Sequence, residues 1–210
     1  MHSFEKTLTM KFRSEELLNS LQRDVRKLME ATQHIQGEDK IKLAYSPKEG
    51  QWSVAQVLEH LNVYGRYYLP AIEKAIAFKS KDTNQWFVPG RFGNYFTNMM
   101  KPSNVYEVKN KMKAFKGYHP DKSVNVEGAF KEFIDQQNKL IHLLEMSKTR
   151  DLNTIRIPIT LTKLIKLKLG DVFRFLIAHE QRHMIQARNT LHDVGIKTDR
   201  FPVILEAAQL

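Results

Sequence analysis

The sequence predicts an all-α fold, a four-helix bundle, and three observations favour it. Four long stretches carry apolar residues three and four positions apart, the spacing of a helix with one buried face. Capping residues stand beside several of these stretches. No internal repeat, low-complexity tract or second domain is recognisable, so we expect residues 1–210 to form one domain.

The first two helices are expected over Ser14–His34 and Val54–Phe78. Ser14 is a candidate N-cap for the first, and Ser53 forms a capping box with Gln56 before the second. Their apolar faces are predicted to consist of Leu17, Leu18, Leu21, Val25 and Leu28, and of Val54, Val57, Leu58, Leu61 and Tyr64. Pro70 removes one amide donor inside the second helix, where a kink is expected.

The last two helices are expected over Val126–Ser147 and Asp171–Val194, with Gly195 as the C-cap of the fourth. Their inward residues are predicted to be Phe130, Phe133, Leu140, Ile141 and Leu144, and Phe173, Ile177, Met184, Ala187 and Leu191.

Two connections between these helices are long. Residues 79–125, between the second and third helices, are rich in aromatic residues, Gly and Pro and are too long for a plain loop. We expect this irregular connection to contain short helical turns and to lie over one end of the bundle. Residues 151–169 are expected to form either an extended pair or another loop.

The composition excludes several classes of protein. Because the chain has no cysteine, disulfides, thiolate nucleophiles and Cys-based metal sites are excluded, and any metal must be bound by His, Asp or Glu. No apolar run could span a membrane, and the charged N-terminus does not match a signal peptide, so we expect a cytoplasmic protein with no membrane partner. The net charge of +10 is spread over scattered lysines without a nucleic-acid motif, which predicts a solvated surface rather than nucleic-acid binding.

The expected fourth helix contains the pattern His179-Glu180-x-x-His183. Histidines four apart lie on one face of a helix and can bind one metal ion together, although the spacing also occurs by chance. Zinc proteases share this pattern but need a third ligand after the helix. Position 189 is Asn where one such class has His, and only Glu206 follows as a downstream Glu, so the sequence argues against a protease.

A facing helix of a bundle can supply the third ligand, and His60 on the flank of the second helix is the candidate. Glu180 falls near the centre of the apolar stripe and needs a partner. It is interpreted either as a supporting residue behind the metal ligands or as the partner of a buried arginine, Arg66 or Arg174. Gln186 is interpreted as a supporting residue with a mainly structural role.

These motifs together resemble the DinB-like superfamily of helical-bundle metal proteins. In that family a Trp followed by Ser or Thr opens the second helix eight residues before a His, as Trp52, Ser53 and His60 do here. Its last long helix carries H-x-x-x-H-x-x-Gln, often with Arg before the second His, matching Arg182 and its neighbours. The lysine-rich segment 109–120 is also similar. Gln56 replaces the usual Glu, and the insert at 86–96 is longer than expected.

The resemblance implies an up-down-down-up bundle with a divalent metal ion, zinc or nickel, bound by His60, His179 and His183. It implies either a metal-dependent hydrolase or a thiol-dependent transferase, with a small-molecule substrate such as a low-molecular-weight thiol. The alternative is a non-catalytic homodimeric interaction module with a structural or vestigial metal site, in which the apolar tail 201–210 packs on the partner.

The remaining aromatic residues and histidines leave further alternatives open. The aromatic insert either lines the pocket or fills the long connection; its residues are Trp86, Phe87, Arg91, Tyr95 and Phe96. Four histidines are expected on the surface, and these are His34, His119, His142 and His192.

Overall fold

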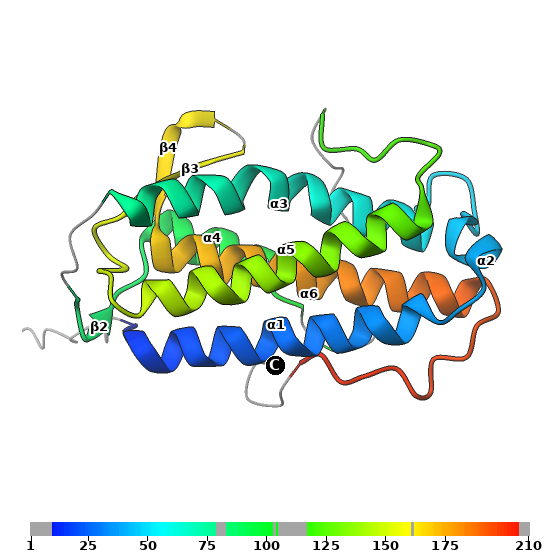
Figure 1. Ribbon diagram of the computed structural model, residues 1–210, viewed down its shortest axis with the longest axis horizontal. Helices are drawn as coiled ribbons and strands as arrows, with labels where there is room; N and C mark the ends of the chain where they lie inside the picture. Colours follow the sequence, from blue (N-terminus) through cyan, green and yellow to red (C-terminus); the bar gives the residue numbers. More distant parts are fainter. Residues whose placement is uncertain (1–9, 79–82, 103, 105–116, 161, 206–210) are drawn as a thin grey trace, which may run out of the picture.

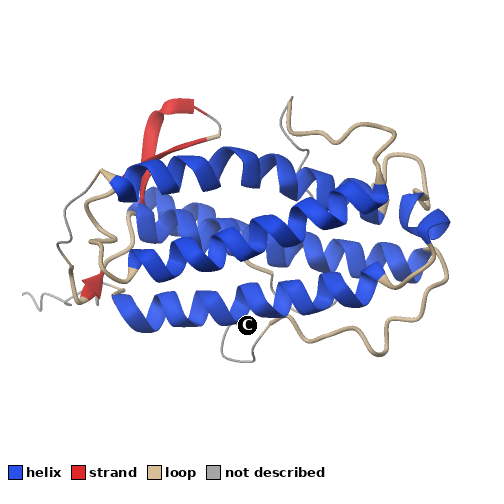
Figure 2. Cartoon of the chain, in the orientation of Figure 1, coloured by secondary structure: helices blue, strands red, loops and turns tan. Residues whose placement is uncertain are grey.

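The structure is a computed structural model that describes residues 10–78, 83–102, 104, 117–160 and 162–205. Four long helices dominate it (Figures 1 and 2): α1 Ser14–Gln36, α3 Val54–Ala77, α5 Val126–Ser147 and α6 Leu169–Asp193. All four predicted helices are therefore present, with ends shifted by at most a few residues. The short helix α2, Lys40–Ala44, follows α1.

The four helices have the up-down-down-up arrangement. In Figure 1, α1 and α6 run in one direction, and α3 and α5 run in the other. The helix α5 packs between α1 and α3, and α6 also contacts both of these helices. Because α3 and α5 are parallel neighbours, the chain must return along the length of the bundle between them, which explains the long connection.

The sequence predicts that this connection lies over one end of the bundle. That prediction is wrong for the ten-residue helix α4, Arg91–Met100, which packs along α6. The approach is close because Gly93 faces the Asp171 side chain, and the backbone N–H of Gly90 donates a hydrogen bond to that carboxylate at 2.8 Å. The strand β2, Trp86–Phe87, pairs antiparallel with β1, Phe12–Arg13.

Residues 151–169 contain an antiparallel hairpin, so the extended pair is the correct alternative. The strand β3, Arg156–Ile159, pairs with β4, Thr162–Lys168, and α6 begins directly after β4. The turn residue Thr160 lies beside α3, where its backbone N–H donates a hydrogen bond to the Tyr68 hydroxyl at 3.2 Å. The hairpin therefore carries Thr160 to the middle of α3.

Helix ends follow the predicted capping chemistry with one exception. The capping box of Ser53 and Gln56 is complete, and at the end of α6 the N–H of Gly195, at φ 76°, donates to the carbonyl of His192. Ser14 was expected as an N-cap but is the first helical residue. Its hydroxyl donates instead to the carbonyl of Asn84 at 2.6 Å, because that segment runs beside the start of α1.

The core contains the apolar faces of all four long helices. The predicted inward residues are buried, apart from Ile141, which is half-buried. The α3 helix continues through Pro70. The tail residues Ile204 and Leu205 are buried against their own chain, and Phe201 packs edge-on against His34. These described tail residues therefore pack on their own bundle, and the homodimer stays a prediction.

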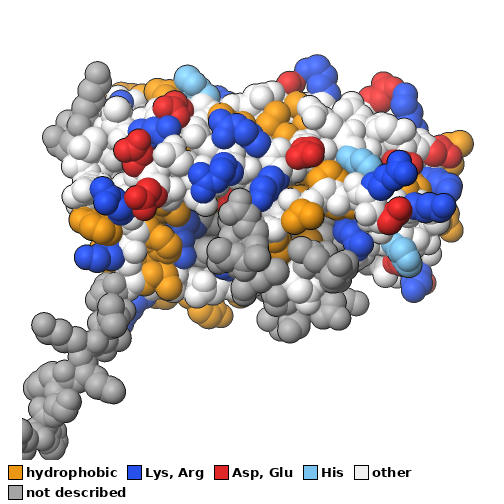
Figure 3. All heavy atoms as spheres, turned by 90° about the horizontal axis from the view of Figure 1, so that it is seen from below, with side chains coloured by type: hydrophobic (Ala, Val, Ile, Leu, Met, Phe, Trp, Pro, Cys, Tyr) orange, Lys and Arg blue, Asp and Glu red, His pale blue; other side chains and the backbone are white. Residues whose placement is uncertain are grey.

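The described helices are either too short or too polar to cross a lipid bilayer. On the face shown in Figure 3, lysines and arginines are interspersed with acidic side chains and separated by uncharged ones. This distribution agrees with the scattered positive charge in the sequence.

Candidate metal centre

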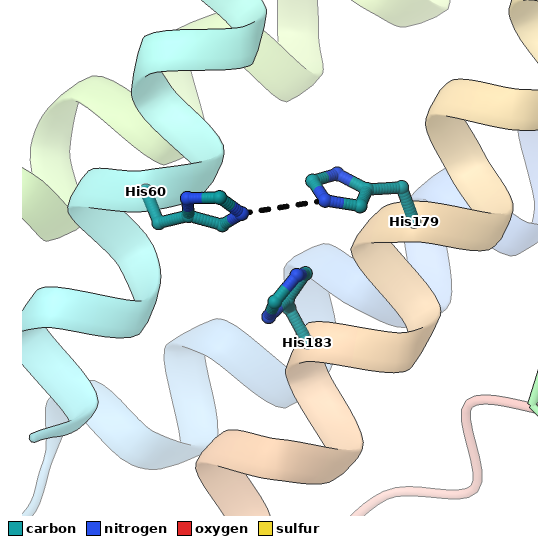
Figure 4. Close-up of side chains that lie close together, drawn as sticks. All are labelled: His60, His179 and His183. Atoms are coloured by element: carbon teal, nitrogen blue, oxygen red, sulfur yellow. Dashed lines mark hydrogen bonds between the residues drawn. The ribbon is translucent and has the colours of Figure 1, made fainter. Parts of the chain in front are cut away.

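Three histidines from two helices meet between α3 and α6 (Figure 4). His60 comes from α3, and His179 and His183 come from consecutive turns of α6. One ring nitrogen from each residue lies within 4.8 Å of the others. The centroids of the His179 and His183 rings are 4.5 Å apart, as are those of His60 and His183. The structure therefore brings together the three residues predicted as metal ligands.

The ring orientations of two histidines are fixed by oxygen acceptors. His60 Nδ1 lies 2.7 Å from the carbonyl oxygen of Tyr118, and His183 Nδ1 lies 2.9 Å from Oε1 of Gln186. Each acceptor requires a proton on Nδ1, which leaves Nε2 as the free ligand atom on both rings. This arrangement is typical of metal-binding histidines, and it gives Gln186 a direct contact with the cluster.

The nitrogen atoms at the centre of the cluster fit a cation. Nε2 of His60 lies 3.3 Å from Nε2 of His179, and Nδ1 of His179 is buried without a hydrogen-bond partner. Two lone pairs facing each other repel unless a proton or a cation lies between them. Three neutral imidazoles form a donor set suited to zinc, nickel, iron or copper.

Burial keeps all three imidazoles neutral. Desolvation lowers the pKa of His60 to about 4, although its hydrogen bond to Tyr118 opposes the shift. Desolvation also holds the pKa values of His179 and His183 well below the usual range, and the nearby charge of Arg182 contributes to both. A neutral imidazole is the form that binds metal, so no proton needs to leave these ligands at neutral pH.

Aromatic rings surround the cluster on the remaining sides. Trp52 lies 4.8 Å from His60 and stacks with His183 at 6.1 Å, between ring centroids. Tyr64 lies 4.3 Å from His179, and Phe175 stacks on the same ring at 5.9 Å. These apolar walls reduce contact of the imidazoles with water. The sequence placed Tyr64 in the core, but its contact with the cluster depends on how α3 approaches α6.

Glu180 is hydrogen-bonded to an amide rather than paired with an arginine. Its Oε1 accepts a hydrogen bond from Nε2 of Gln137 on α5 at 3.1 Å, and its Oε2 has no partner. Burial raises the pKa of Glu180 to about 8. The pairing with Arg66 or Arg174 is wrong, because each of these arginines binds other carboxylates. The role of Glu180 as a supporting residue behind the ligands stays a prediction.

Both arginines have surface or local partners. Arg66 forms ion pairs with Glu59 and Glu132, and Arg174 pairs with Asp171 at 3.5 Å. The Glu180 carboxyl therefore has an amide, not a cation, as its partner. Within the described part of the chain, no carboxylate joins the group of three histidines.

The aromatic insert divides into surface and core residues. Tyr95 and Arg91 are exposed, and Trp86 is in contact with Lys11 at 4.3 Å on the surface. Phe87 is fully buried and Phe96 packs against Phe175. Phe87 therefore fills the core of the long connection. Phe96 is connected to the histidines through Phe175, which stacks on His179.

Three of the four histidines expected on the surface are exposed, and His34 is half-buried. Exposed are His119, His142 and His192. His119 nevertheless lies edge-on to Trp52, with 5.9 Å between ring centroids, at the edge of the cluster. Residues 109–116 of the lysine-rich segment lie outside the described residues.

Comparison with known proteins agrees with this arrangement. The sequence model of the DinB superfamily matches residues 18–187. The chain belongs to the DinB superfamily. All three histidines lie within the matched range. A search of curated proteins finds no match.

One solved structure similar to this DinB-superfamily chain is YfiT from Bacillus subtilis. The two chains share 13% sequence identity with a TM-score of 0.52, and the similarity covers 94% of this chain and 93% of YfiT. YfiT is described as a probable metal-dependent hydrolase with an unusual four-helix bundle topology. At this level of identity the likeness shows the fold alone.

Proposed function

We propose that this DinB-superfamily protein is a metal-dependent hydrolase that binds one divalent ion, zinc or nickel, through His60, His179 and His183. The proposal depends chiefly on one observation: three neutral imidazoles converge, and two of them are oriented by acceptors on Nδ1. The description of YfiT as a probable metal-dependent hydrolase supports it.

The metal would supply the main chemistry of hydrolysis. A divalent ion bound by three neutral nitrogen ligands lowers the pKa of a coordinated water towards about 7 and polarises a carbonyl group. In the reaction, water adds to the acyl carbon, the bond to the leaving group breaks, and the leaving group takes a proton.

The residues of the chain would position and desolvate this centre. The Tyr118 carbonyl and Gln186 hold two ligand rings in the required tautomer. Trp52, Tyr64 and Phe175 restrict water around the imidazoles, which strengthens electrostatic interactions there. His183 is the one member of the cluster that is half-buried rather than buried.

The metal content of untagged protein tests the proposal. The protein is dialysed against a mixture of zinc, nickel, manganese and iron, freed of loose ions and measured by elemental mass spectrometry. We expect about one ion per chain in the wild type and in His142→Ala, an exposed-histidine control, but much less in His60→Ala and His183→Ala. Metal retained in His60→Ala would contradict a site shared by two helices.

Hydrolysis is then tested with activated esters and amides, comparing the metal-loaded protein with the same protein after chelation. Turnover that requires both the metal and His60 would support a hydrolase. A metal-loaded protein without metal-dependent turnover of any member of the series would contradict it.

Thiol-dependent transfer is the second candidate function. The position of Glu180, outside the group of three histidines, supports it. This carboxyl is bonded to Gln137 and lies outside the histidine group, so the described residues provide no carboxylate base to take a proton from water. A thiol ionises more readily than water and needs less help from a base. Metal-dependent consumption of 2-mercaptoethanol in the presence of an electrophile would indicate this reaction.

A non-catalytic homodimeric bundle is the third candidate. Large apolar side chains are exposed at separate places, including Ile41, Phe78 and Leu164. Sedimentation equilibrium tests the homodimer. A dimer whose affinity is unchanged by chelation, together with no metal-dependent activity, would favour an interaction module over an enzyme.

A further inference from the structure

A group of hydroxyls lies beside the candidate metal centre and has no part in holding the histidines. It contains Tyr64 and Tyr68 of α3, Tyr118 of the loop before α5, and Thr160 of the β3–β4 turn. The Tyr68 hydroxyl lies 3.5 Å from the Thr160 hydroxyl and also accepts a hydrogen bond from the Thr160 N–H. The Thr160 side chain also lies near Tyr64 and Tyr118, since it affects the pKa of each of these two hydroxyls. Four hydroxyls from three separate segments thus lie around Thr160.

Tyr64 connects this hydroxyl group to the histidines. The centroid of its ring lies 4.3 Å from that of His179 and 5.1 Å from that of His60. Its hydroxyl lies near Thr160. The hydroxyl group is therefore about one phenol ring away from the cluster. Tyr118 packs against Tyr64 at 5.0 Å, and its carbonyl oxygen orients His60.

The position of the group makes it accessible to a molecule that reaches the metal. Tyr64 and Tyr68 are buried, but Tyr118, Thr160 and His183 are half-buried, so the histidine cluster and the hydroxyl group each include at least one partly exposed residue. Phenylalanine at positions 64 and 68 would fill the same apolar space, so packing alone does not require these two hydroxyls. The hydroxyls are therefore available for a ligand as well as for one another.

The hydroxyls would act as hydrogen-bond donors to an oxygen atom. Burial raises the pKa values of Tyr64, Tyr68 and Tyr118, so all three keep their protons at physiological pH. The electrostatic environment favours an anion: the three imidazoles are neutral, Arg182 lies close enough to lower the pKa values of His179 and His183, and no carboxylate joins the cluster within the described chain. A bound divalent ion would add to this positive potential.

We infer that the hydroxyls of Tyr64, Tyr68, Tyr118 and Thr160 bind a carboxylate of the substrate while its acyl group lies at the metal. The substrate class is then a small acyl compound that carries a carboxylate about one aromatic ring away from the bond that breaks. This inference rests on the proposed metal-dependent function and deepens it.

Two metal-binding probes test the inference without relying on turnover. Benzohydroxamate binds a metal through its hydroxamate, and 4-carboxybenzohydroxamate adds a carboxylate one ring away. Their dissociation constants are measured by calorimetry on zinc-loaded protein. The wild type is expected to bind the carboxylated probe about tenfold more tightly, since hydrogen bonds to a charged group contribute about 1.5–3 kcal/mol.

Substitutions that remove single hydroxyls test whether these groups cause the tighter binding of the carboxylated probe. Tyr64→Phe and Tyr118→Phe are each expected to reduce the ratio of the two affinities severalfold, while both keep the aromatic ring and the backbone carbonyl that orients His60. The zinc content of each variant is measured beside the wild type. Tyr67→Phe is the matched control, because the Tyr67 hydroxyl donates to the carbonyl of Ile159 at 3.2 Å instead. The control is expected to keep the full preference.

The possible failures are distinguishable. Equal affinities of zinc-loaded wild type for the two probes, or a preference that both Tyr→Phe variants retain, would overturn the inference and leave the metal site intact. A preference lost equally in Tyr67→Phe would also overturn it, because the effect would then come from general disturbance of α3. Failure of the wild type to bind zinc would overturn the proposed function and the inference together.

Discussion

At the scale of single residues, the site depends on atoms that hold the ligands rather than on the ligands alone. Gln186 and the Tyr118 carbonyl determine which nitrogen of each ring faces the cluster. Glu180, the central acid of the His-Glu-x-x-His pattern, is instead paired with Gln137. In a zinc protease the Glu of this five-residue pattern acts on the metal-bound water. Here the Glu carboxyl is hydrogen-bonded to Gln137, so the same pattern places its acid in a different environment.

Gln186→Leu tests the contribution of a ligand-orienting residue. Without the acceptor at Nδ1, His183 can rotate or adopt the other tautomer, so zinc affinity is expected to fall about 10–100-fold. Competition with a chromophoric chelator measures this affinity. Gln186→Glu keeps an oxygen acceptor and should retain most of the affinity. An unchanged affinity in Gln186→Leu would mean that packing alone orients His183.

Because the pKa of Glu180 is raised, we expect the stability of the metal-free protein to depend on pH. This pKa is about 8 in the folded chain against an ordinary value of 4.5. Between these values the folded state holds a proton that the unfolded state has released. The contribution of Glu180 to the free energy of unfolding should therefore fall as pH rises through this window, by at most about 1.4 kcal/mol per pH unit, and stop falling above pH 8. Below about pH 6.5 the three buried histidines contribute in the opposite direction, because their pKa values are lowered in the folded chain.

Urea unfolding at several pH values in the presence of a chelator measures this dependence. Glu180→Gln removes the ionisable group and is expected to flatten the curve between about pH 7 and 8, above the range in which the three histidines titrate in the unfolded chain. Glu49→Gln, at an exposed loop position, should leave the curve as in the wild type. A curve in Glu180→Gln as steep as in the wild type would rule out Glu180 as the source.

At the scale of helices and strands, local signals and one motif-based tertiary contact were predictable, but the other tertiary contacts were not. The four helices, the capping box at Ser53 and the convergence of His60 with α6 follow from periodicity, short motifs and family resemblance. The hydrogen bond from His60 to Tyr118 joins residues 58 apart, and the path of α4 depends on Gly93 and Asp171 coming together. No pattern within one segment records such an approach, so neither was foreseen.

The docking of α4 on α6 can be tested at Gly93. A Cβ atom there would lie 2.2 Å from Cγ of Asp171, whose carboxylate is already held by the Gly90 N–H and by Arg174. Gly93→Ala should therefore displace α4 and destabilise the protein by about 1–3 kcal/mol. Urea unfolding and hydrogen exchange of α4 amides measure the effect.

Asn98→Ala is the control for this substitution, because Asn98 is exposed on the same helix. An alanine there should change stability by less than about 0.5 kcal/mol, as for most surface substitutions. A Gly93→Ala protein as stable as the wild type would mean that the Asp171 side chain can move aside at no cost in stability. The position of α4 would then not depend on the close approach at Gly93.

At the scale of the whole molecule, the candidate metal joins helices that are distant in sequence. His60 and His179 are 119 residues apart, and the path between them includes the return along the bundle and the β3–β4 hairpin. Ions that bind the folded state alone add RT ln(1 + [L]/Kd) to its stability, about 2.7 kcal/mol at one hundred times Kd. For a protein of this size we therefore expect the thermal midpoint to rise by about 5–10 °C.

Histidine variants separate binding across two helices from binding to α6 alone. His60→Ala leaves His179 and His183 on one helix, so a metal held by these two does not connect α3 to α6, and we expect zinc to raise its midpoint little. His142→Ala should respond like the wild type. Calorimetric scans of the three proteins with and without zinc give the comparison. An equal rise in His60→Ala would mean that the stabilising ion binds elsewhere, since the loss of one of three ligands must weaken a site built from both helices.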